Sequence, residues 1–110
     1  MEFDVDKIYQ EVSQAGEDWA DKKSAYEALD DNTKSVLSEI ATDFMDGAKT
    51  SKSEAELRAQ SSKAYREHLY EKQKARRAWL VAQVKYDSLK MLAELRRSQE
   101  STKRAEMQLR

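Results

Sequence analysis

A periodic series of residues in the second half of the chain has the types and spacing needed to bind phosphates. Its members recur at steps of three, four, four and three, so on a helix they share one face. They are Lys63, Arg66, Tyr70, Lys74 and Arg77, named here the basic stripe. Repeated cations can bind a phosphate backbone, and an interleaved tyrosine can stack on an unpaired base. The stripe therefore predicts a nucleic-acid interface, which we expect Arg76 and Lys85 to extend.

The same cations also suit a solvated helix surface that binds nothing, since Glu67 and Glu71 interrupt the positive series. The distribution of charge along the chain favours binding. Residues 1–56 hold fifteen acidic and six basic side chains, whereas residues 57–110 hold six acidic and fourteen basic ones. An imbalance of this size indicates either an electrostatic partner for one half or two halves that face each other in a folded monomer.

Few other residues suit catalysis or metal binding. The 110 residues include no cysteine, no proline, two glycines and one histidine. This composition excludes thiolate sites and a glycine-rich phosphate loop. His68 precedes Glu71 by three residues, but a metal site of the helical-bundle type needs a second histidine. We expect His68 to lie in a helix seam with a hydrogen bond across the bundle, in a protein that is not an enzyme and needs no metal or cofactor.

Apolar residues at alternating steps of three and four predict an all-α fold. We expect an acidic helical hairpin at residues 1–47, whose first helix runs from about Phe3 to Leu29. Residues 30–33 are rich in helix-capping side chains and should separate it from a second helix that Gly47 ends. Gly16 lies beside the first seam, where it indicates a bend or the close approach of another helix.

One long basic helix is expected at residues 54–110, after a polar linker at residues 48–53. Ser51 and Ser53 each precede a glutamate by three residues, which is the spacing of a helix-capping box. Beyond them no proline or glycine occurs and strong helix formers dominate. We therefore expect an uninterrupted helix to about Ala105.

Apolar residues cover more than one side of this long helix between about residues 78 and 95. A helix that is apolar on most sides is normally buried on most sides. We expect contacts within the chain to cover one side and a second copy to cover another, so that the protein is a homo-oligomer. The candidate contact residues are Trp79, Ala82, Tyr86, Leu89, Leu92 and Leu95. The apolar surface also includes Leu80, Val81, Val84 and Met91.

The acidic first half supports a different function. A helix with a high density of negative charge resembles the phosphates of DNA and can bind a protein partner. The alternative hypothesis is a protein-binding coiled-coil adaptor, or a bacteriophage inhibitor, that acts through its acidic N-terminal helix. A solvated surface that binds nothing is the simpler explanation of the same acidic residues.

No targeting or membrane segment is apparent in the sequence. The longest unbroken apolar run, from Ala78 to Ala82, is far shorter than the roughly 20 residues that cross a bilayer. The first residues lack the basic and then apolar order of a secretory signal. We therefore expect a soluble, cytoplasmic protein without a membrane partner.

The segment from Tyr65 to Arg97 resembles helices of small bacteriophage accessory proteins and is similar in texture to UvsY-type recombination mediators. The shared pattern places basic residues ahead of a tyrosine-containing apolar patch, here Lys72, Lys74, Arg76 and Arg77 ahead of Tyr86. The resemblance implies a phage or prophage accessory protein that binds single-stranded DNA in recombination or replication. It also implies ring-like oligomers that help to load a recombinase.

Overall fold

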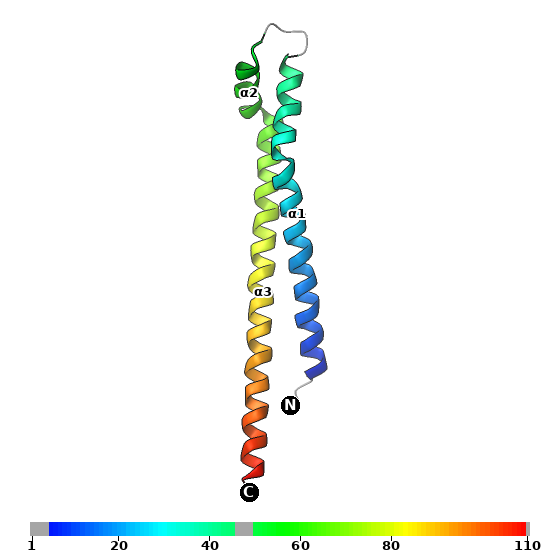
Figure 1. Ribbon diagram of the computed structural model, residues 1–110, viewed down its shortest axis with the longest axis vertical. Helices are drawn as coiled ribbons and strands as arrows, with labels where there is room; N and C mark the ends of the chain where they lie inside the picture. The colour runs from blue at the N-terminus through cyan, green and yellow to red at the C-terminus, as the bar shows by residue number, and fades with distance from the viewer. Residues whose placement is uncertain (1–4, 46–49, 110) are drawn as a thin grey trace. The chain divides into compact units, whose positions relative to one another are not determined.

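The computed structural model describes residues 5–45 and 50–109, and these residues fold into three α-helices. Helix α1 spans Val5–Met45, α2 spans Lys52–Gln60 and α3 spans Lys63–Gln108 (Figure 1). The described residues contain no strand, so the prediction of an all-α fold is confirmed. Within the same residues, no helix has an apolar stretch long enough to span a membrane.

Helix α1 runs without interruption, so the predicted break at residues 30–33 is wrong. The Thr33 hydroxyl donates a 3.0 Å hydrogen bond to the carbonyl of Leu29, one helical turn earlier, rather than capping a new helix. Both residues are half-buried, so the helix seam continues through this segment and its packing outweighs the capping preference. The hairpin expected at residues 1–47 is one long helix over its described part, and Gly47 lies outside the described residues.

The linker expected at residues 48–53 contains the start of a helix instead. Ser51 is the N-cap of α2, and its side chain accepts a 3.2 Å hydrogen bond from the backbone N–H of Glu54. This bond satisfies one of the N–H groups that a helix leaves open at its first turn. The capping role of Ser51 is therefore confirmed, whereas Ser53 lies inside α2.

The expected long basic helix is interrupted at Ser61 and Ser62, which separate α2 from α3. The Ser61 hydroxyl donates to the carbonyl of Leu57 at 3.1 Å, and the Ser62 hydroxyl donates to that of Ala59 at 2.6 Å. The Ser62 oxygen also accepts a 3.2 Å hydrogen bond from the backbone N–H of Tyr65 in the first turn of α3. Serine side chains compete in this way with helical backbone bonds, so the helix breaks here without a proline or glycine.

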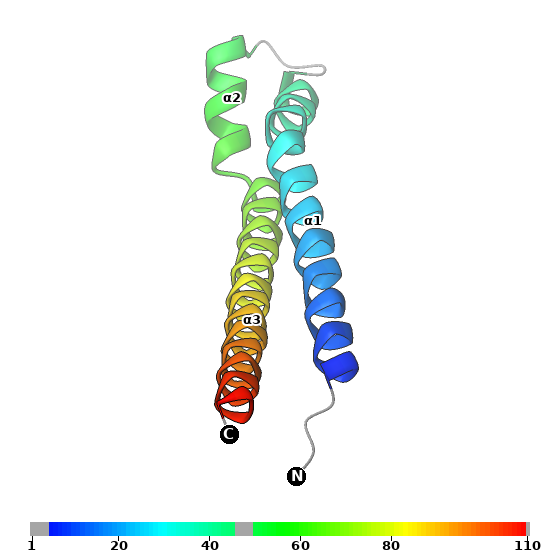
Figure 2. The same cartoon turned by 60° about the horizontal axis from the view of Figure 1, so that its bottom comes forward.

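The chain divides into two compact units, and each contains part of α1 and part of α3. Unit 1 comprises residues 1–21 and 79–110, and unit 2 comprises residues 22–78. Within each unit the parts of α1 and α3 lie side by side and run in opposite directions (Figures 1 and 2).

In unit 1, small residues allow α1 to approach α3 closely. Ala15 and Ala82 are each only 5% exposed. The Tyr86 ring packs against Trp19, with ring centroids 5.9 Å apart, and a Cβ added at Gly16 would lie 3.1 Å from two atoms of the same tyrosine ring. Of the two roles predicted for Gly16, the close approach of another helix is confirmed.

A second contact in unit 1 joins the first turns of α1 to α3. The Arg97 guanidinium donates a 2.6 Å hydrogen bond to the Tyr9 hydroxyl, and its central carbon lies 5.9 Å from the centroid of the tyrosine ring. This hydrogen bond also raises the pKa of Arg97 above its usual value. Because Tyr9 meets Arg97 while Trp19 meets Tyr86, the antiparallel register of the two helices is set at two separate levels.

In unit 2, α2 packs against the last turns of α1. Ala41, Ala55 and Ala59 form a buried cluster, and Leu37 and Ile40 pack against it while remaining half-buried. Alanine at the contact brings the two helix backbones close together, so the cluster is small and contains no large side chain that is fully buried.

Two polar contacts join α1 to α3 in unit 2. The Lys72 ammonium lies 2.7 Å from the Asp30 carboxylate, and Nε2 of His68 lies 3.0 Å from the Thr33 hydroxyl. Because Thr33 donates its one proton to the carbonyl of Leu29, Nε2 of His68 must be the donor in this pair. The hydrogen bond predicted for His68 is therefore confirmed.

Replacement of Gly16 by leucine should destabilise unit 1, because the new side chain would occupy the space of the Tyr86 ring. Overpacking of this kind lowers the free energy of unfolding by about 1–3 kcal/mol. The better helix propensity of leucine offsets less than about 1 kcal/mol of that loss. Urea unfolding followed by near-ultraviolet circular dichroism, which reports on Trp19 and Tyr86, measures the loss. The matched control is Ala20→Leu at an exposed position of α1, which should change stability by less than about 0.5 kcal/mol. Equal stability of the two variants would contradict the packing described.

The Lys72–Asp30 pair should make stability depend on pH in the alkaline range. The hydrogen bond to Asp30 is the main cause that raises the pKa of Lys72 above its usual 10.5. Because the pKa of Lys72 is raised in the folded state, the pair contributes fully to the free energy of unfolding below pH 10.5. That contribution is lost as the pH rises through the higher pKa of the folded state. Urea midpoints of the wild type and of Lys72→Met should therefore differ at neutral pH and converge above pH 10.5.

Tyrosines also ionise near pH 10, so the difference between wild type and variant is the quantity to compare. Asp30→Asn is the control, because it removes the partner of Lys72. In that background the difference in urea midpoint between Lys72 and Lys72→Met should no longer depend on pH. A difference in urea midpoint between the wild type and Lys72→Met that stays constant across this pH range would contradict a stabilising Lys72–Asp30 pair.

Candidate nucleic-acid interface

Helix α3 divides its basic residues between two sides in unit 2. Lys72 is turned toward α1, where it pairs with Asp30. All five members of the basic stripe are exposed to solvent, as is Arg76. The cations of the stripe make no ion pair with α1 among the described residues. The sequence left open whether the acidic half of the chain neutralises the basic half. Among the described residues Lys72 pairs with the acidic half in this way, and the stripe does not.

Two cations of the stripe have partners on their own helix. Lys63 Nζ lies 3.8 Å from Glu67, and Lys74 Nζ lies 3.5 Å from Glu71. All four side chains are more than half exposed, so each pair is screened by water and contributes little. These lysines can exchange a carboxylate for a phosphate at small cost.

The two arginines of the stripe are more available still. Arg66 and Arg77 are exposed, and neither forms an ion pair within the part of the chain that the structure describes. An arginine offers a planar fork of donors that matches two phosphate oxygens. These two residues are therefore the strongest candidates for phosphate contacts.

Tyr70 is the aromatic member of the stripe and is 62% exposed. The ammonium group of Lys74 lies 5.5 Å from the centroid of its ring. Cations bind to aromatic faces at this distance, and a base can stack on an exposed ring. The arrangement brings an aromatic surface and a positive charge together, as a nucleotide requires.

Arg76 and Lys85, the predicted extensions of the interface, lie in different surroundings. Arg76 lines a small pocket of unit 2 together with Tyr26 and Lys72. Lys85 belongs to unit 1, where it faces Glu11 and Asp18 across a groove. Because two carboxylates oppose Lys85, a phosphate chain has less reason to bind there than at the stripe.

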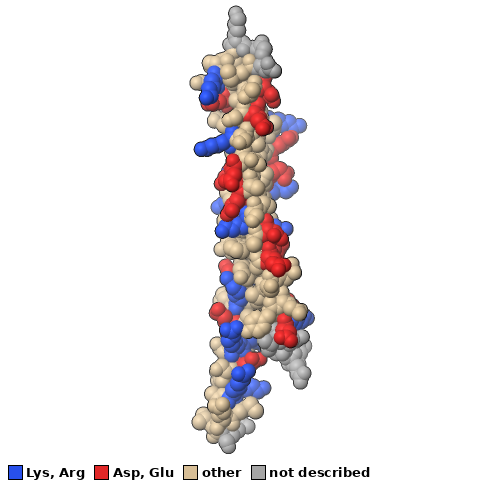
Figure 3. Space-filling model, turned by 45° about the vertical axis from the view of Figure 1, so that its right-hand side comes forward, with Lys and Arg blue, Asp and Glu red and all other residues tan. Residues whose placement is uncertain are grey.

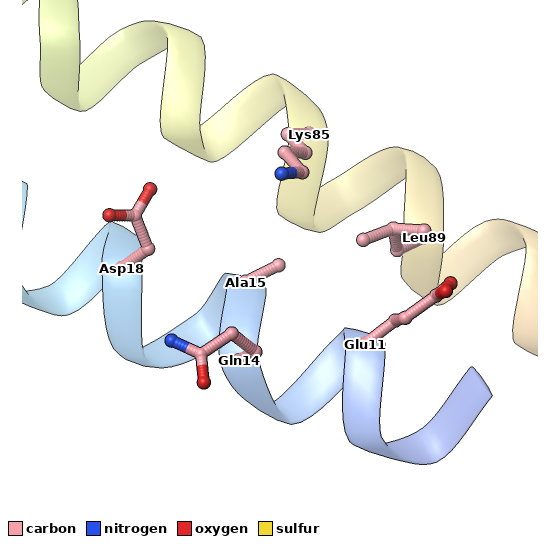
Figure 4. Close-up of a pocket in the computed structure, with 6 residues that line it drawn as sticks. All are labelled: Glu11, Gln14, Ala15, Asp18, Lys85 and Leu89. Carbon is pink, nitrogen blue, oxygen red and sulfur yellow. The ribbon is translucent and has the colours of Figure 1, made fainter. Parts of the chain in front are cut away.

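The groove beside Lys85 is a feature that the sequence analysis did not identify. It has a volume of about 590 Å³ and is lined by α1 and α3 within unit 1. Figure 4 shows Lys85 and Leu89 on α3 opposite Ala15 on α1, with Asp18 and Glu11 to either side of Ala15. The spacing of Glu11, Ala15 and Asp18 at steps of four and three places these residues on one helix face and was a signal in the sequence.

The structure divides the residues predicted for oligomerisation between two environments in unit 1. Ala82 is buried, Tyr86 packs on Trp19, and Leu89 lines the groove beside Ala15. With the half-buried Trp79 they form what we call the inner seam of α3, namely Trp79, Ala82, Tyr86 and Leu89. Leu92 and Leu95 remain exposed. The inner seam therefore packs within the chain, whereas Leu92 and Leu95 stay open to water.

Charges of both signs are interspersed over the face of the molecule in Figure 3, where neither colour forms an unbroken field. This agrees with the glutamates that interrupt the basic stripe. Within residues 5–45 and 50–109 there is no cluster of three acidic, histidine or cysteine side chains that could hold a metal ion. The stripe is thus the arrangement with the best-defined binding chemistry in the described part of the chain.

Comparison with known proteins adds no assignment. We found no match to this chain among protein-family models, curated proteins or solved structures.

Proposed function

We propose that this protein binds single-stranded nucleic acid along the basic stripe of α3. The observation that carries the proposal is the pair Arg66 and Arg77, which are exposed, make no ion pair among the described residues, and lie on the same helix face as the exposed Tyr70. Exposed arginines can bind phosphates, and an open aromatic ring between them can stack on an unpaired base.

The dimensions of the stripe suit a strand of several nucleotides. From Lys63 to Arg77 the helix rises by about 21 Å at 1.5 Å per residue. Its four cations are three, eight and three residues apart, which is about 4.5, 12 and 4.5 Å along the helix, and Tyr70 lies in the wider gap. Each cation can meet a separate phosphate of a strand that runs along the helix, with electrostatic attraction as the main source of affinity.

Tyr70 favours a single strand over a duplex. The bases of a duplex stack on one another, so an exposed tyrosine on a straight helix cannot reach their faces. An unpaired base can stack on the ring, while Lys74 binds the adjoining phosphate. The resemblance of this segment to UvsY-type mediators also supports single-stranded DNA, and with it a role in phage recombination or replication.

Removal of the two unpaired arginines should weaken binding and reduce its salt dependence. Each phosphate contact contributes about 0.7 to the slope of log K against log salt concentration for single strands. We expect Arg66→Gln with Arg77→Gln to lower the slope by about 1.4 and to weaken binding to all sequences about equally. Fluorescence anisotropy of a labelled oligonucleotide at several salt concentrations measures both quantities.

The matched control for this variant is Lys34→Gln with Lys52→Gln, which removes the same charge from exposed positions outside α3. The control should bind like the wild type, with the same slope. Equal losses in both variants would show attraction by net charge alone. Absence of salt-dependent binding by the wild type would contradict the proposal and favour the alternative of a protein partner for the acidic helix.

Replacement of Tyr70 by alanine should cost about 1–3 kcal/mol of binding free energy if one base stacks on the ring. Tyr70→Phe keeps the aromatic face and should retain most of the affinity. Because Tyr70 is exposed, neither variant should alter the helix content, which circular dichroism checks. Equal affinities of the alanine and phenylalanine variants would rule out stacking at this residue. A double-stranded oligonucleotide of the same length should show no difference between them.

A further inference from the structure

Helix α3 has a second apolar face in unit 1, in addition to the inner seam that packs on α1. Its residues are large and leave up to 70% of their surface open to water. They are Leu80, Val81, Val84, Met91, Leu92 and Leu95. Isolated apolar side chains are common on protein surfaces, but these six share one side of α3 over about four turns, with the exposed Ser88 in their middle.

The centre of this face has the spacing of a coiled-coil seam. Val81, Val84, Ser88, Met91 and Leu95 follow one another at steps of three, four, three and four. We call these five residues the outer seam. A repeat of this kind allows a second helix to pack along the first with side chains from each fitting between those of the other.

The outer seam is the counterpart of the inner one on the far side of the helix. Val81, Val84 and Met91 each follow a residue of the inner seam, Trp79, Ala82 and Leu89 respectively, by two positions. Two positions turn a helix with 3.6 residues per turn by about 200°. The contact with α1 therefore leaves the outer seam uncovered, and within the described residues no other element of unit 1 covers it.

The size of the apolar face decides what can cover it. The six side chains leave on the order of 500 Å² of apolar surface in water, as much as the largest patch on a typical monomer. Two such faces in contact would bury about 1,000 Å² in total, which is the lower limit for a specific protein interface. The face is thus sufficient for a pair of like helices without any contribution from elsewhere.

We propose that a second copy of this chain covers the outer seam, so that two copies associate through α3 of unit 1. A seam with a heptad repeat is complementary to itself, because the same residues supply the protruding side chains and the spaces that receive them. A two-fold axis then places each copy's outer seam on the other's, and both apolar faces leave water together. The proposal goes beyond nucleic-acid binding and does not depend on it, since the basic stripe belongs to unit 2.

Two methionines with nearly the same exposure allow a matched test. Met91 belongs to the outer seam and is 70% exposed. Met107 lies near the end of α3, is not part of the outer seam, and is 66% exposed. A charge at Met91 would be buried without a partner on association, whereas a charge at Met107 would stay in water. We expect Met91→Glu to raise the dissociation constant of the dimer by about 100-fold or more and Met107→Glu to leave it unchanged.

Sedimentation equilibrium of the full chain, freed of nucleic acid, measures these constants. The wild type should sediment with at least twice the monomer mass of 12.8 kDa at micromolar concentrations. Circular dichroism should show equal helix content for both variants, because neither methionine is buried in the chain. High salt should leave the assembly intact, since apolar contacts drive it, whereas nucleic-acid binding should weaken.

A gain of association provides a test that misfolding cannot imitate. Ser88 is exposed at the middle of the outer seam, and leucine there would complete the apolar series. Ser88→Leu should tighten the dimer by about tenfold or more. The proposal is overturned by a wild type that remains monomeric at 100 µM, by assembly of Met91→Glu at wild-type strength, or by a Ser88→Leu variant with no tighter association. The Arg66→Gln with Arg77→Gln variant should assemble normally, so the two proposals can fail separately.

Discussion

Close contact of α1 with another helix across small residues is the constraint on which both units depend, since α1 meets α3 in this way in unit 1 and meets α2 in this way in unit 2. The residues buried in the described chain are all alanines, and Gly16 admits the ring of Tyr86 at the tightest point. Small residues bring helix backbones together but cover only a narrow strip of each helix. Two helices joined in this way leave most of their surface in water. The remaining sides of α3 are therefore available for other partners, and their chemistry distinguishes one part of the helix from another.

Along α3, polar and apolar residues outside the contact with α1 are not mixed at random. In unit 2 the exposed face carries the basic stripe, and in unit 1 it carries the outer seam. The same steps of three and four run through both sets in the sequence. A single periodic pattern thus changes from cationic to apolar at about residue 78, and one helix carries both of the surfaces for which we propose a partner, a phosphate chain for the first and a second helix for the other.

Much of the fold follows from residue spacing. The absence of proline and the steps of three and four were enough to predict long helices and the seam position of His68. For Gly16 they left a bend and a close approach as alternatives, and the structure shows the close approach. The sequence analysis predicted one helix boundary that does not exist, at residues 30–33, and missed one that does, at Ser61 and Ser62. Both errors reflect competition between local and tertiary effects. Capping preferences at residues 30–33 lost to packing along the seam, whereas Ser61 and Ser62 ended a helix that propensity alone would continue.

The candidate sites were predictable in part for a similar reason. Periodicity shows that residues share a helix face, so the basic stripe could be found from sequence. It does not show which of two apolar faces another helix will cover. The inner and outer seams of α3 have the same spacing, and large side chains such as Trp79 and Leu95 occur in both. Only the position of Ala15 and Trp19 on α1 shows that the inner seam is the one that packs within the chain.

A core built from alanine also has a thermodynamic consequence. Burial of small side chains removes little hydrocarbon from water, so unfolding of either unit should carry a small increment in heat capacity for its length. The stability curve is then flat with temperature and the transition is broad, since few cooperative contacts are lost at once. In such a molecule any ligand that binds only the native helices adds a large fraction of the total stability by mass action. For a chain with such a core, the concentration of a ligand of this kind would set the amount of folded protein as much as the interior does.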